Sequence, residues 1–294
     1  MRKILNSRKA APYVFILPFV LTVLLFWVGP VVNGVLLSFQ DVMKDEWVGL
    51  HNYQRMLTDR IFYKAIWNSV KYMAGTLLLL IPFPLLFAAL LNSKLMRGAD
   101  FFKSVYFLPA LTSVVVAGTV FRLMFGESAR ALANQLIGFL GISPIKWLKN
   151  AGTAYFAMLL LCCWRWTGVN ILYFLAGIQS IPQELYEAAE IDGSSPWQSF
   201  RYITIPLVKP TAIYVLTISI YAGLSMFLES FMLWKGNNSP NNIGLTIVGY
   251  LYRQGIEKRA MGYACAVGIV LLLMVMLVNM VQLRLTGAFR KEAE

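Results

Sequence analysis

A short run near the middle of the chain places aromatic, amide and cationic side chains within an apolar segment. In CCWRWTGVNILYF, the side chains of Trp166, Asn170 and Tyr173 recur at helical spacing and would share one face of a helix. Flat aromatic rings provide contact area for an apolar face of a ligand, and an amide can hydrogen bond to its polar groups. Arg165 lies beside them, and an ionised residue inside a membrane segment indicates a functional position that faces a polar interior.

A second apolar run, YVLTISIYAGLSMFLES, carries polar groups at a similar spacing. Tyr221, Ser225 and Glu229 recur every four residues, and Ser219 lies nearby. Glu229 can accept hydrogen bonds from hydroxyl groups or pair with an arginine, and it also suits the water boundary at the end of a span. Arg165 can equally form an ion pair that only holds helices together. Both interpretations of each residue stay open.

The loop between these two runs, ELYEAAEIDGSSPWQSFRYITIP, is charged and contains helix start and stop signals. Ser180 and Gln183 have the spacing of a capping box, so a short helix should begin there. The helix should run to about Asp192, because Gly193 can adopt the left-handed conformation that ends a helix. Ser195 is suited to cap a second short helix. We therefore expect two helices that project from the membrane.

The first of these short helices has the features of a docking surface. Ala188 and Ala189 leave a bare patch where another backbone could approach closely, and Tyr186 adds an apolar contact next to it. Glu187 and Asp192 supply acceptors for basic or backbone donors of a partner. The alternative is a well-capped loop that packs only on its own helices.

Several function classes are excluded by what the sequence lacks. The single histidine, His51, and the cysteines at 162, 163 and 265 offer no usual zinc site and no C-x-x-C pair. No G-x-x-x-x-G-K-[ST] phosphate-binding motif is present, so ATP and magnesium would bind to another chain. The net charge of +12 comes from scattered basic residues, which indicates contact with anionic lipid rather than nucleic acid.

Composition and hydropathy predict a membrane protein. The chain is 58% hydrophobic and 14% charged, whereas a soluble domain has about a quarter charged residues. A spanning helix needs about 20 mostly apolar residues. Six segments meet this length, at about 12–37, 68–91, 105–125, 154–178, 207–231 and 261–283. The connecting loops are too short for a core of their own, so we expect one transmembrane domain over 1–294, with the loop 180–206 outside the membrane.

The distribution of basic residues predicts that both termini are cytoplasmic. Six spans place the two termini on the same side, and cytoplasmic segments are enriched in lysine and arginine. The basic residues that support this orientation are Arg2, Lys3, Arg8, Lys9, Lys94, Arg97, Lys103, Arg290 and Lys291. The opposite loops also hold basic residues, so the rule is not clean. In this orientation the 180–206 loop is cytoplasmic.

The 180–206 loop resembles the EAA loop of ABC importer permeases. The matching positions are Glu187, Ala188, Ala189, Gly193, Ile203, Ile205 and Pro206. The segments SFQDV…EWVGLHNYQRML, IWNSVKY and VYFLPALTSVVVAGTVFRLMF resemble the carbohydrate-uptake branch, first-permease type, so the resemblance covers nearly the whole chain. WRWTGVNILYFLAGIQSIP and GNNSPNNIGLTIVGYLYRQG look most like permeases for arabino-oligosaccharides.

The resemblance implies an all-α membrane protein with six transmembrane helices of type I ABC importer architecture and a cytoplasmic coupling helix. Residues of the coupling loop would be Glu184, Tyr186, Glu187, Ala188, Ala189, Asp192, Gly193 and Pro206. The family's substrate contacts lie in spans four and five. This chain has small and apolar residues where maltose-type permeases have asparagines in span five. Only the region is therefore carried over, with Trp164 and Ser219 as positional matches.

The resemblance also implies the partners. They are a second, similar permease, a cytosolic ATPase dimer that binds ATP and magnesium, an extracellular sugar-binding protein, an oligosaccharide and membrane lipid. The chain itself would bind no cofactor and would not be an enzyme, and it would lie in a bacterial or archaeal cell membrane as a multi-pass protein.

Three alternatives remain. A permease of the same family for another glycan or a glycerol phosphodiester would share these features. An ion-coupled secondary transporter would need intramembrane acids and usually a repeated half, yet only Glu229 fits and no repeat is visible. A polytopic membrane enzyme would need a cluster of catalytic side chains.

Overall fold

The computed structural model describes residues 11–93 and 96–287, which are almost entirely helical, and the helical class expected from the sequence is confirmed. The elements up to the middle of the chain are α2 (Ala11–Val23), η1 (Leu24–Val28), α3 (Gly29–Leu37), β1 (Gln40–Asp41), β2 (Glu46–Trp47), α4 (His51–Thr58), α5 (Arg60–Leu80), α6 (Pro82–Asn92), α7 (Ala99–Leu111), α8 (Val114–Met124) and α9 (Leu132–Gly138). Those that follow are α10 (Ala151–Gln179), α11 (Gln183–Ile191), α12 (Pro196–Ser199), η2 (Phe200–Thr204), α13 (Ile205–Leu207), α14 (Lys209–Leu224), α15 (Leu228–Trp234), η3 (Pro240–Asn242), α16 (Ile247–Tyr252), η4 (Arg253–Glu257) and α17 (Met261–Leu285).

Five helices among the described residues are long and apolar enough to cross a membrane. They are Pro12–Leu37, Arg60–Asn92, Ala151–Gln179, Lys209–Trp234 and Met261–Leu285. The pair α7 and α8 passes the same test but is bent by 94°, and it makes a sixth span if the two helices cross together. The basic residues Arg2, Lys3, Arg8, Lys9, Lys94, Arg290 and Lys291, used above for the orientation, lie outside the described residues.

The chain packs as two compact units, of which the smaller comprises Met1–Asp59 and Leu251–Leu272. In this unit the first helix continues past Pro18 and Pro30 through a π-helical turn. It leads into an antiparallel hairpin in which Gln40 pairs with Trp47. The amide of Asn52 on α4 donates to the carbonyl oxygens of Ser38, at 2.9 Å, and Gln40, at 3.1 Å, and so fixes the start of the hairpin.

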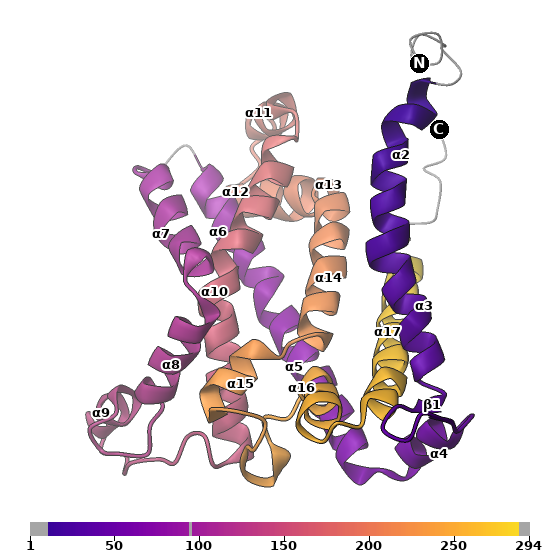
Figure 1. The fold of residues 1–294 in the computed structure, drawn as a ribbon. Coiled ribbons are helices and arrows are strands. Elements are labelled where there is room, and N and C mark those ends of the chain that lie inside the picture. The colour runs from indigo at the N-terminus through magenta and orange to yellow at the C-terminus, as the bar shows by residue number, and fades with distance from the viewer. Residues whose placement is uncertain (1–10, 94–95, 288–294) are drawn as a thin grey trace. The chain divides into compact units, whose positions relative to one another are not determined.

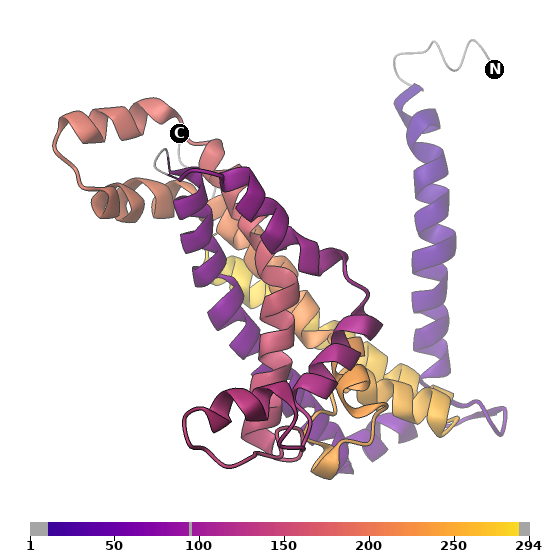
Figure 2. The same ribbon diagram turned by 90° about the vertical axis from the view of Figure 1, so that its left-hand side faces the viewer.

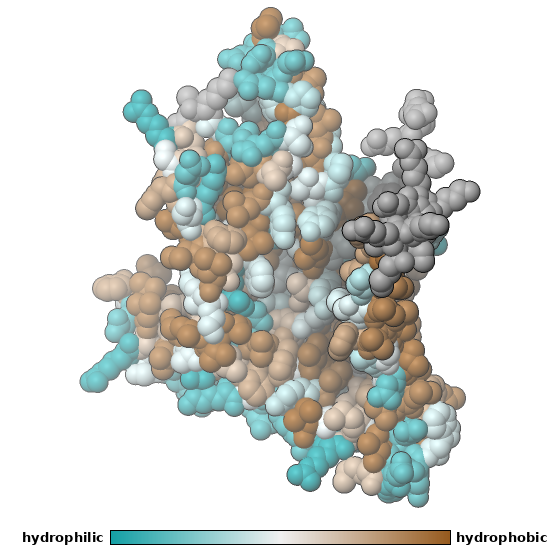
Figure 3. Space-filling model, turned by 45° about the horizontal axis from the view of Figure 1, so that its top comes forward, coloured by the Kyte–Doolittle hydropathy of each residue, from teal (hydrophilic) through white to brown (hydrophobic). Residues whose placement is uncertain are grey.

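The larger unit, Arg60–Tyr250 with Leu273–Glu294, is a helical bundle around α10 (Figure 1). Helix α10 packs against α5, α6, α7, α8, α14 and α15. One buried cluster surrounds its first half and includes Tyr72, Phe121, Leu161 and Leu233. A second cluster surrounds its second half and includes Ala88, Phe174 and Val215. The space-filling view shows hydrophilic residues gathered around α11, at one end of this unit, and hydrophobic residues over the flank that carries α7 and α8 (Figure 3).

Two prolines break the second span between α5 and α6. In an uninterrupted helix the carbonyl of Leu80 would accept from the amide of residue 84, but Pro84 has no N–H. The side chain of Asn170 on α10 replaces this donor, because its Nδ2 lies 2.8 Å from the Leu80 oxygen. Asn170 is buried at this position. A buried amide thus repairs a backbone break that lipid could not satisfy.

The third span consists of two helices, where the sequence predicted a single helix over about 105–125. Helix α7 begins earlier, at Ala99, and ends at Leu111, and α8 begins at Val114. Pro109 lies in the last turn of α7 and removes one helical donor, and both Thr112 and Ser113 have extended ψ angles, of 135° and 131°. The chain therefore turns sharply at these two residues.

A close approach between backbones holds α7 against α10. A Cβ at Gly168 would overlap the carbonyl oxygen of Tyr106 and lie 2.8 Å from the amide nitrogen of Phe107. Only glycine fits here, because the neighbouring atoms belong to the backbone and cannot rotate away. Such small-residue contacts are typical of helix packing in membranes.

We predict that Gly168→Ala destabilises the protein by about 1–3 kcal/mol or more, because the added methyl group must separate α7 from α10. Thermal unfolding of the detergent-purified protein measures the effect. Gly152→Ala is the matched control, since it lies on the same helix and its Cβ would meet nothing within 4 Å. An unchanged unfolding temperature for Gly168→Ala would contradict the close approach.

Candidate functional site

The 180–206 segment begins differently from the predicted capping box. Ser180 belongs to the end of α10, where its hydroxyl donates to the Gly177 carbonyl oxygen at 2.8 Å. Helix α11 starts after Pro182, whose side chain makes no cap hydrogen bond. The amide of Gln183 donates to the Glu187 carboxylate at 2.7 Å, one turn further along. The prediction of a Ser180–Gln183 box is wrong because the α10 helix continues through Gln179 and uses Ser180 as its own terminus.

The end of α11 and the start of α12 are as predicted from the sequence. Gly193 has a φ of +78°, and the amides of Gly193 and Ser194 donate to the carbonyls of Glu190 and Ala189 at 3.1 and 2.9 Å. This is the glycine-terminated helix end in which only a residue without Cβ is unstrained. Ser195 then caps α12 in a reciprocal capping box with Gln198.

Helix α11 presents its surface to solvent within the described structure. It contains no buried residue, and it projects with α12 away from the long helices of its unit (Figure 2). Ile191 is 87% exposed, and Glu184, Glu187 and Ala188 are also exposed. An apolar and acidic helix left unpacked in this way has the character of a docking surface.

Tyr186 connects α11 to the segment that leads into the next membrane helix. Its hydroxyl lies 2.9 Å from the hydroxyl of Thr204, which is buried at the end of the π-helical turn η2. Pro206 follows in the first turn of α13, and α14 begins at Lys209. A force applied to α11 therefore reaches α14 through one side-chain contact as well as through the chain.

The two ionised residues of the predicted solute surface form an ion pair inside the bundle. The guanidinium Nη1 of Arg165 on α10 lies 2.8 Å from the Glu229 carboxylate on α15, and the two side chains are 11% and 14% exposed. The guanidinium also lies 5.3 Å from the centre of the Trp166 ring. Of the two interpretations for these residues, the structure shows the ion pair that joins two helices.

The polar residues of span five do not share one continuous helical face. Helix α14 ends at Leu224, Ser225 is its C-terminal cap, and α15 begins three residues later with Glu229 in its first turn. Tyr221 is exposed and Ser219 is half-buried, both on α14. The expected four-residue repeat is wrong as a helical face, because the break at 225–227 turns Glu229 onto a separate helix that packs against α8 and α10.

The aromatic residues of span four divide between the surface and the core of α10. Trp166 and Tyr173 are 39% and 37% exposed, so both rings remain available on one side of the helix. Asn170, which was expected beside them, is buried and bonded to the carbonyl of Leu80. Trp164 is partly exposed and its ring centre lies 5.5 Å from that of Phe121.

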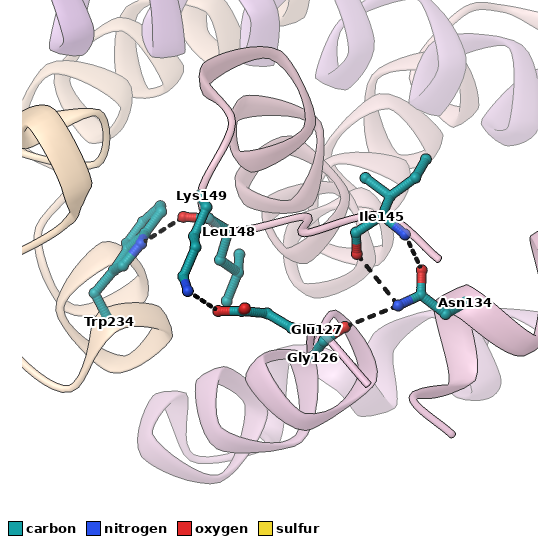
Figure 4. Close-up of polar contacts among 7 residues, drawn as sticks. All are labelled: Gly126, Glu127, Asn134, Ile145, Leu148, Lys149 and Trp234. Atoms are coloured by element: carbon teal, nitrogen blue, oxygen red, sulfur yellow. Dashed lines mark hydrogen bonds and ion pairs between the residues drawn. The ribbon is translucent and has the colours of Figure 1, made fainter. Parts of the chain in front are cut away.

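Sequence reasoning missed a polar centre in the loop between α8 and α10. Asn134 on α9 donates to the carbonyls of Gly126 and Ile145, both at 3.2 Å, and its oxygen accepts from the Ile145 amide at 2.9 Å (Figure 4). The indole of Trp234 donates to the Leu148 carbonyl at 3.0 Å, and Lys149 pairs with Glu127 at 2.9 Å. A lone asparagine in a short apolar stretch was the available signal.

A second missed centre organises the loop after α15. The Asn68 amide donates to the carbonyls of Asn242 and Leu245 at 2.9 and 3.0 Å. Ser69 accepts from the Ile247 amide at 2.9 Å. Adjacent polar residues at the start of the predicted 68–91 span were the signal. No three His, Cys, Asp or Glu side chains come together as metal ligands among the described residues.

Comparison with known proteins shows that the chain is similar to transporter components. The family of binding-protein-dependent transport system inner membrane components matches residues 76–292. The chain is 52% identical, over 99% of its length and 93% of the relative, to the arabinooligosaccharides transport system permease protein AraP of Bacillus subtilis (strain 168). It is 49% identical to the AraP protein of Halalkalibacterium halodurans, over 97% of the chain and 90% of the relative. The lactose transport system permease protein LacF of Rhizobium radiobacter is 30% identical over 92% of each chain.

Solved structures share the fold. A bacterial ABC transporter involved in the import of the acidic polysaccharide alginate has a chain that matches with a TM-score of 0.84, 23% identity and 97% coverage of both chains. The alginate transporter in complex with a pentasaccharide-bound periplasmic protein matches with a TM-score of 0.85 and 22% identity, over 98% of this chain and 97% of that chain.

We predict that Glu229→Gln lowers the free energy of unfolding by about 3 kcal/mol, because Arg165 then stays charged and buried without its carboxylate. The double variant Arg165→Met with Glu229→Gln should recover most of that loss, since no ion remains unpaired. Thermal unfolding of the four proteins of this mutant cycle measures the coupling. Strictly additive effects would show that the two side chains do not stabilise each other.

Proposed function

The chain belongs to the family of binding-protein-dependent transport system inner membrane components, and from this premise we propose that it takes up arabinose-containing oligosaccharides as one permease of an ATP-driven importer. The observation that carries the substrate class is the similarity to two arabino-oligosaccharide permeases over nearly the full length. As a permease it is a membrane transporter component and not an enzyme. ATP and magnesium would bind to a separate ATPase.

The geometry of α11 supports a coupling role. This helix contains no buried residue, ends in a fixed glycine turn at Gly193 and is joined to the entry of α14 by the Tyr186–Thr204 contact. A helix of this kind can sit in a groove of a cytosolic ATPase dimer. ATP-driven closure of the dimer would then push α11, and α10 and α14 would follow. In this arrangement both termini of the chain are cytoplasmic.

The solute would pass on the side of α10 that carries exposed aromatic rings. Trp166 and Tyr173 offer flat faces to a sugar, and hydroxyl groups at Ser219 and Tyr221 on α14 offer hydrogen bonds. The Arg165–Glu229 ion pair holds the Arg165 guanidinium next to the ring of Trp166. A second, similar permease would form the other wall, and an extracellular binding protein would deliver the oligosaccharide.

The proposed substrate is tested by the ATPase activity of the complex purified with its partner subunits in lipid. The binding protein is added together with one of a panel of oligosaccharides that includes arabino-oligosaccharides, lactose and maltose. Stimulation by arabino-oligosaccharides alone is the expected result. Stimulation by another sugar class would place the chain among permeases of the same family for that solute. No stimulation by any sugar, or no ATPase in the purified complex, would contradict the importer function.

We predict that Glu187→Lys reduces oligosaccharide uptake and sugar-stimulated ATPase activity by about tenfold or more while the chain remains in the membrane. Tenfold corresponds to the loss of about 1.4 kcal/mol, which one docking contact can supply. The Glu187 carboxylate is exposed. Among the described residues, its hydrogen-bond partner is the side-chain amide of Gln183 alone, so its replacement should not disturb folding. Transport into proteoliposomes measures uptake.

The matched control for this variant is Glu46→Lys. It makes the same change of charge at an exposed position of the β2 strand, remote in sequence from α11. We expect it to transport at the unsubstituted rate. Normal uptake by Glu187→Lys would argue against the docking role of α11.

A further inference from the structure

The short helix α9 and the turn after it carry a compact apolar surface that the transport function above does not use. We refer to Leu132, Leu136, Phe139, Leu140 and Ile142 as the α9 surface. Phe139 and Leu140 are 88% and 77% exposed, and the other three are also exposed. Five exposed aliphatic and aromatic side chains within eleven residues form a patch that water solvates poorly.

This surface is held firmly in place. Behind it, Asn134 is buried and makes hydrogen bonds to Gly126, Ser128 and Ile145 through its amide nitrogen, and to the indole of Trp147 through its oxygen at 2.8 Å. One side chain thus joins α9 to the end of α8 and to the segment that leads into α10. The apolar patch is therefore a fixed feature of the fold.

The same hydrogen bonds fix α9 beside the ends of two candidate membrane helices. Gly126 follows the last turn of α8, and Trp147 lies just before the start of α10, so α9 lies where two membrane helices end. Tryptophan is enriched at membrane–water interfaces because its ring is apolar and its N–H is polar. Trp147 and Trp234 both donate from their indoles to groups of this loop. The Lys149–Glu127 ion pair, whose side chains are partly exposed, lies in the same loop.

The α9 surface also continues an exposed apolar surface on α8. Val116, Val120 and Leu123 form an exposed stripe along α8, at 55%, 53% and 68% exposure, and they lie in the sixth candidate span. Helix α9 follows at the end of this stripe, on the side of the larger unit opposite α11 (Figure 1). Arg130 and Lys146, which flank the patch in sequence, are exposed and positively charged. They suit the phosphate groups of lipid headgroups.

We propose that the α9 surface is a membrane anchor that lies in the boundary between headgroups and acyl chains, in the leaflet where α8 and α10 end. Its apolar side chains enter the bilayer edge, and Arg130 and Lys146 contact lipid phosphates, as in helices that lie in the membrane plane. The anchor fixes the end of α8 and the start of α10 against lipid. It rests on the membrane location of the chain and not on which sugar it transports.

The test measures where single nitroxide labels lie in the purified complex after reconstitution into vesicles of phosphatidylethanolamine and phosphatidylglycerol. The native cysteines at 162, 163 and 265 are first replaced by alanine, and Phe139→Cys and Leu140→Cys are labelled in that background. Asn238→Cys is the matched control, because it is an exposed polar residue in another loop of the same unit. Collision rates with oxygen, which concentrates in lipid, and with a water-soluble nickel complex are compared by electron paramagnetic resonance.

We expect the oxygen-to-nickel ratio at residues 139 and 140 to exceed the ratio at residue 238 several-fold. A ratio equal to that of the control would place the surface in water and overturn the anchor. Protection from both reagents would show that a protein partner covers the surface, and would also overturn it. Because labels at exposed positions leave the Asn134 hydrogen bonds in place, the outcome does not depend on a variant that fails to fold.

A second measurement separates lipid charge from apolar insertion. Replacing phosphatidylglycerol with a zwitterionic lipid removes the partner of Arg130 and Lys146 but leaves the acyl chains. The nitroxide at residue 140 should then move toward water, with a smaller oxygen-to-nickel ratio that still exceeds the control. A ratio that does not respond would remove the two basic residues from the proposal.

Discussion

The constraint on which this fold depends is that lipid offers no hydrogen bonds to a broken helix. Each backbone group freed inside the membrane must find a partner within the protein, at a cost of several kcal/mol if it does not. The spans of the larger unit break at Pro82–Pro84, at Thr112–Ser113 and after Leu224. A side chain from a neighbouring helix supplies a partner at the proline break, and another does so at the end of α15. Asn170 donates to the carbonyl of Leu80, and Arg122 donates to the carbonyl of Met232 in the last turn of α15 at 3.0 Å.

These repairs explain why polar residues in the apolar spans are ambiguous in the sequence. A buried asparagine that completes a broken helix and an asparagine that binds a sugar have the same helical spacing. Asn170 lies in register with Trp166 and Tyr173, yet its amide is directed to α5 and α6 whereas the two rings remain partly exposed. The proline pair in IPFPLL predicts a backbone carbonyl without its helical donor, but the sequence does not indicate which helix provides the replacement. Only the packing of α10 against the break decides it.

Local signals were more informative than long-range ones. The glycine turn at Gly193 and the helix cap at Ser195 were both predicted from local residues, and in the structure Gln198 completes a capping box with Ser195. The Ser180 box failed because α10 is longer than its apolar pattern requires and takes Ser180 as its own end. The bend of 94° between α7 and α8 and the turn before α15 were missed because hydropathy measures length and polarity but not direction. The Arg165–Glu229 pair was one of two open interpretations, and the contact between α10 and α15 selects it.

Helix α10 is the element that can connect the proposed docking surface to the solute surface. Between Arg165 and Gln179 it is fixed to four neighbours: to α15 by the ion pair, to α7 by the close approach at Gly168, to the α5–α6 break by Asn170, and to α14 at Gly177, where a Cβ would overlap the side chain of Thr211. Helix α11 begins only four residues after α10 ends. A displacement of α11 is therefore expected to move this group of helices together. Each contact involves a backbone atom, a buried ion pair or a glycine, so the helices cannot separate without losing it. The exposed rings of Trp166 and Tyr173 lie on the same part of α10, so the solute surface would change position in the same step.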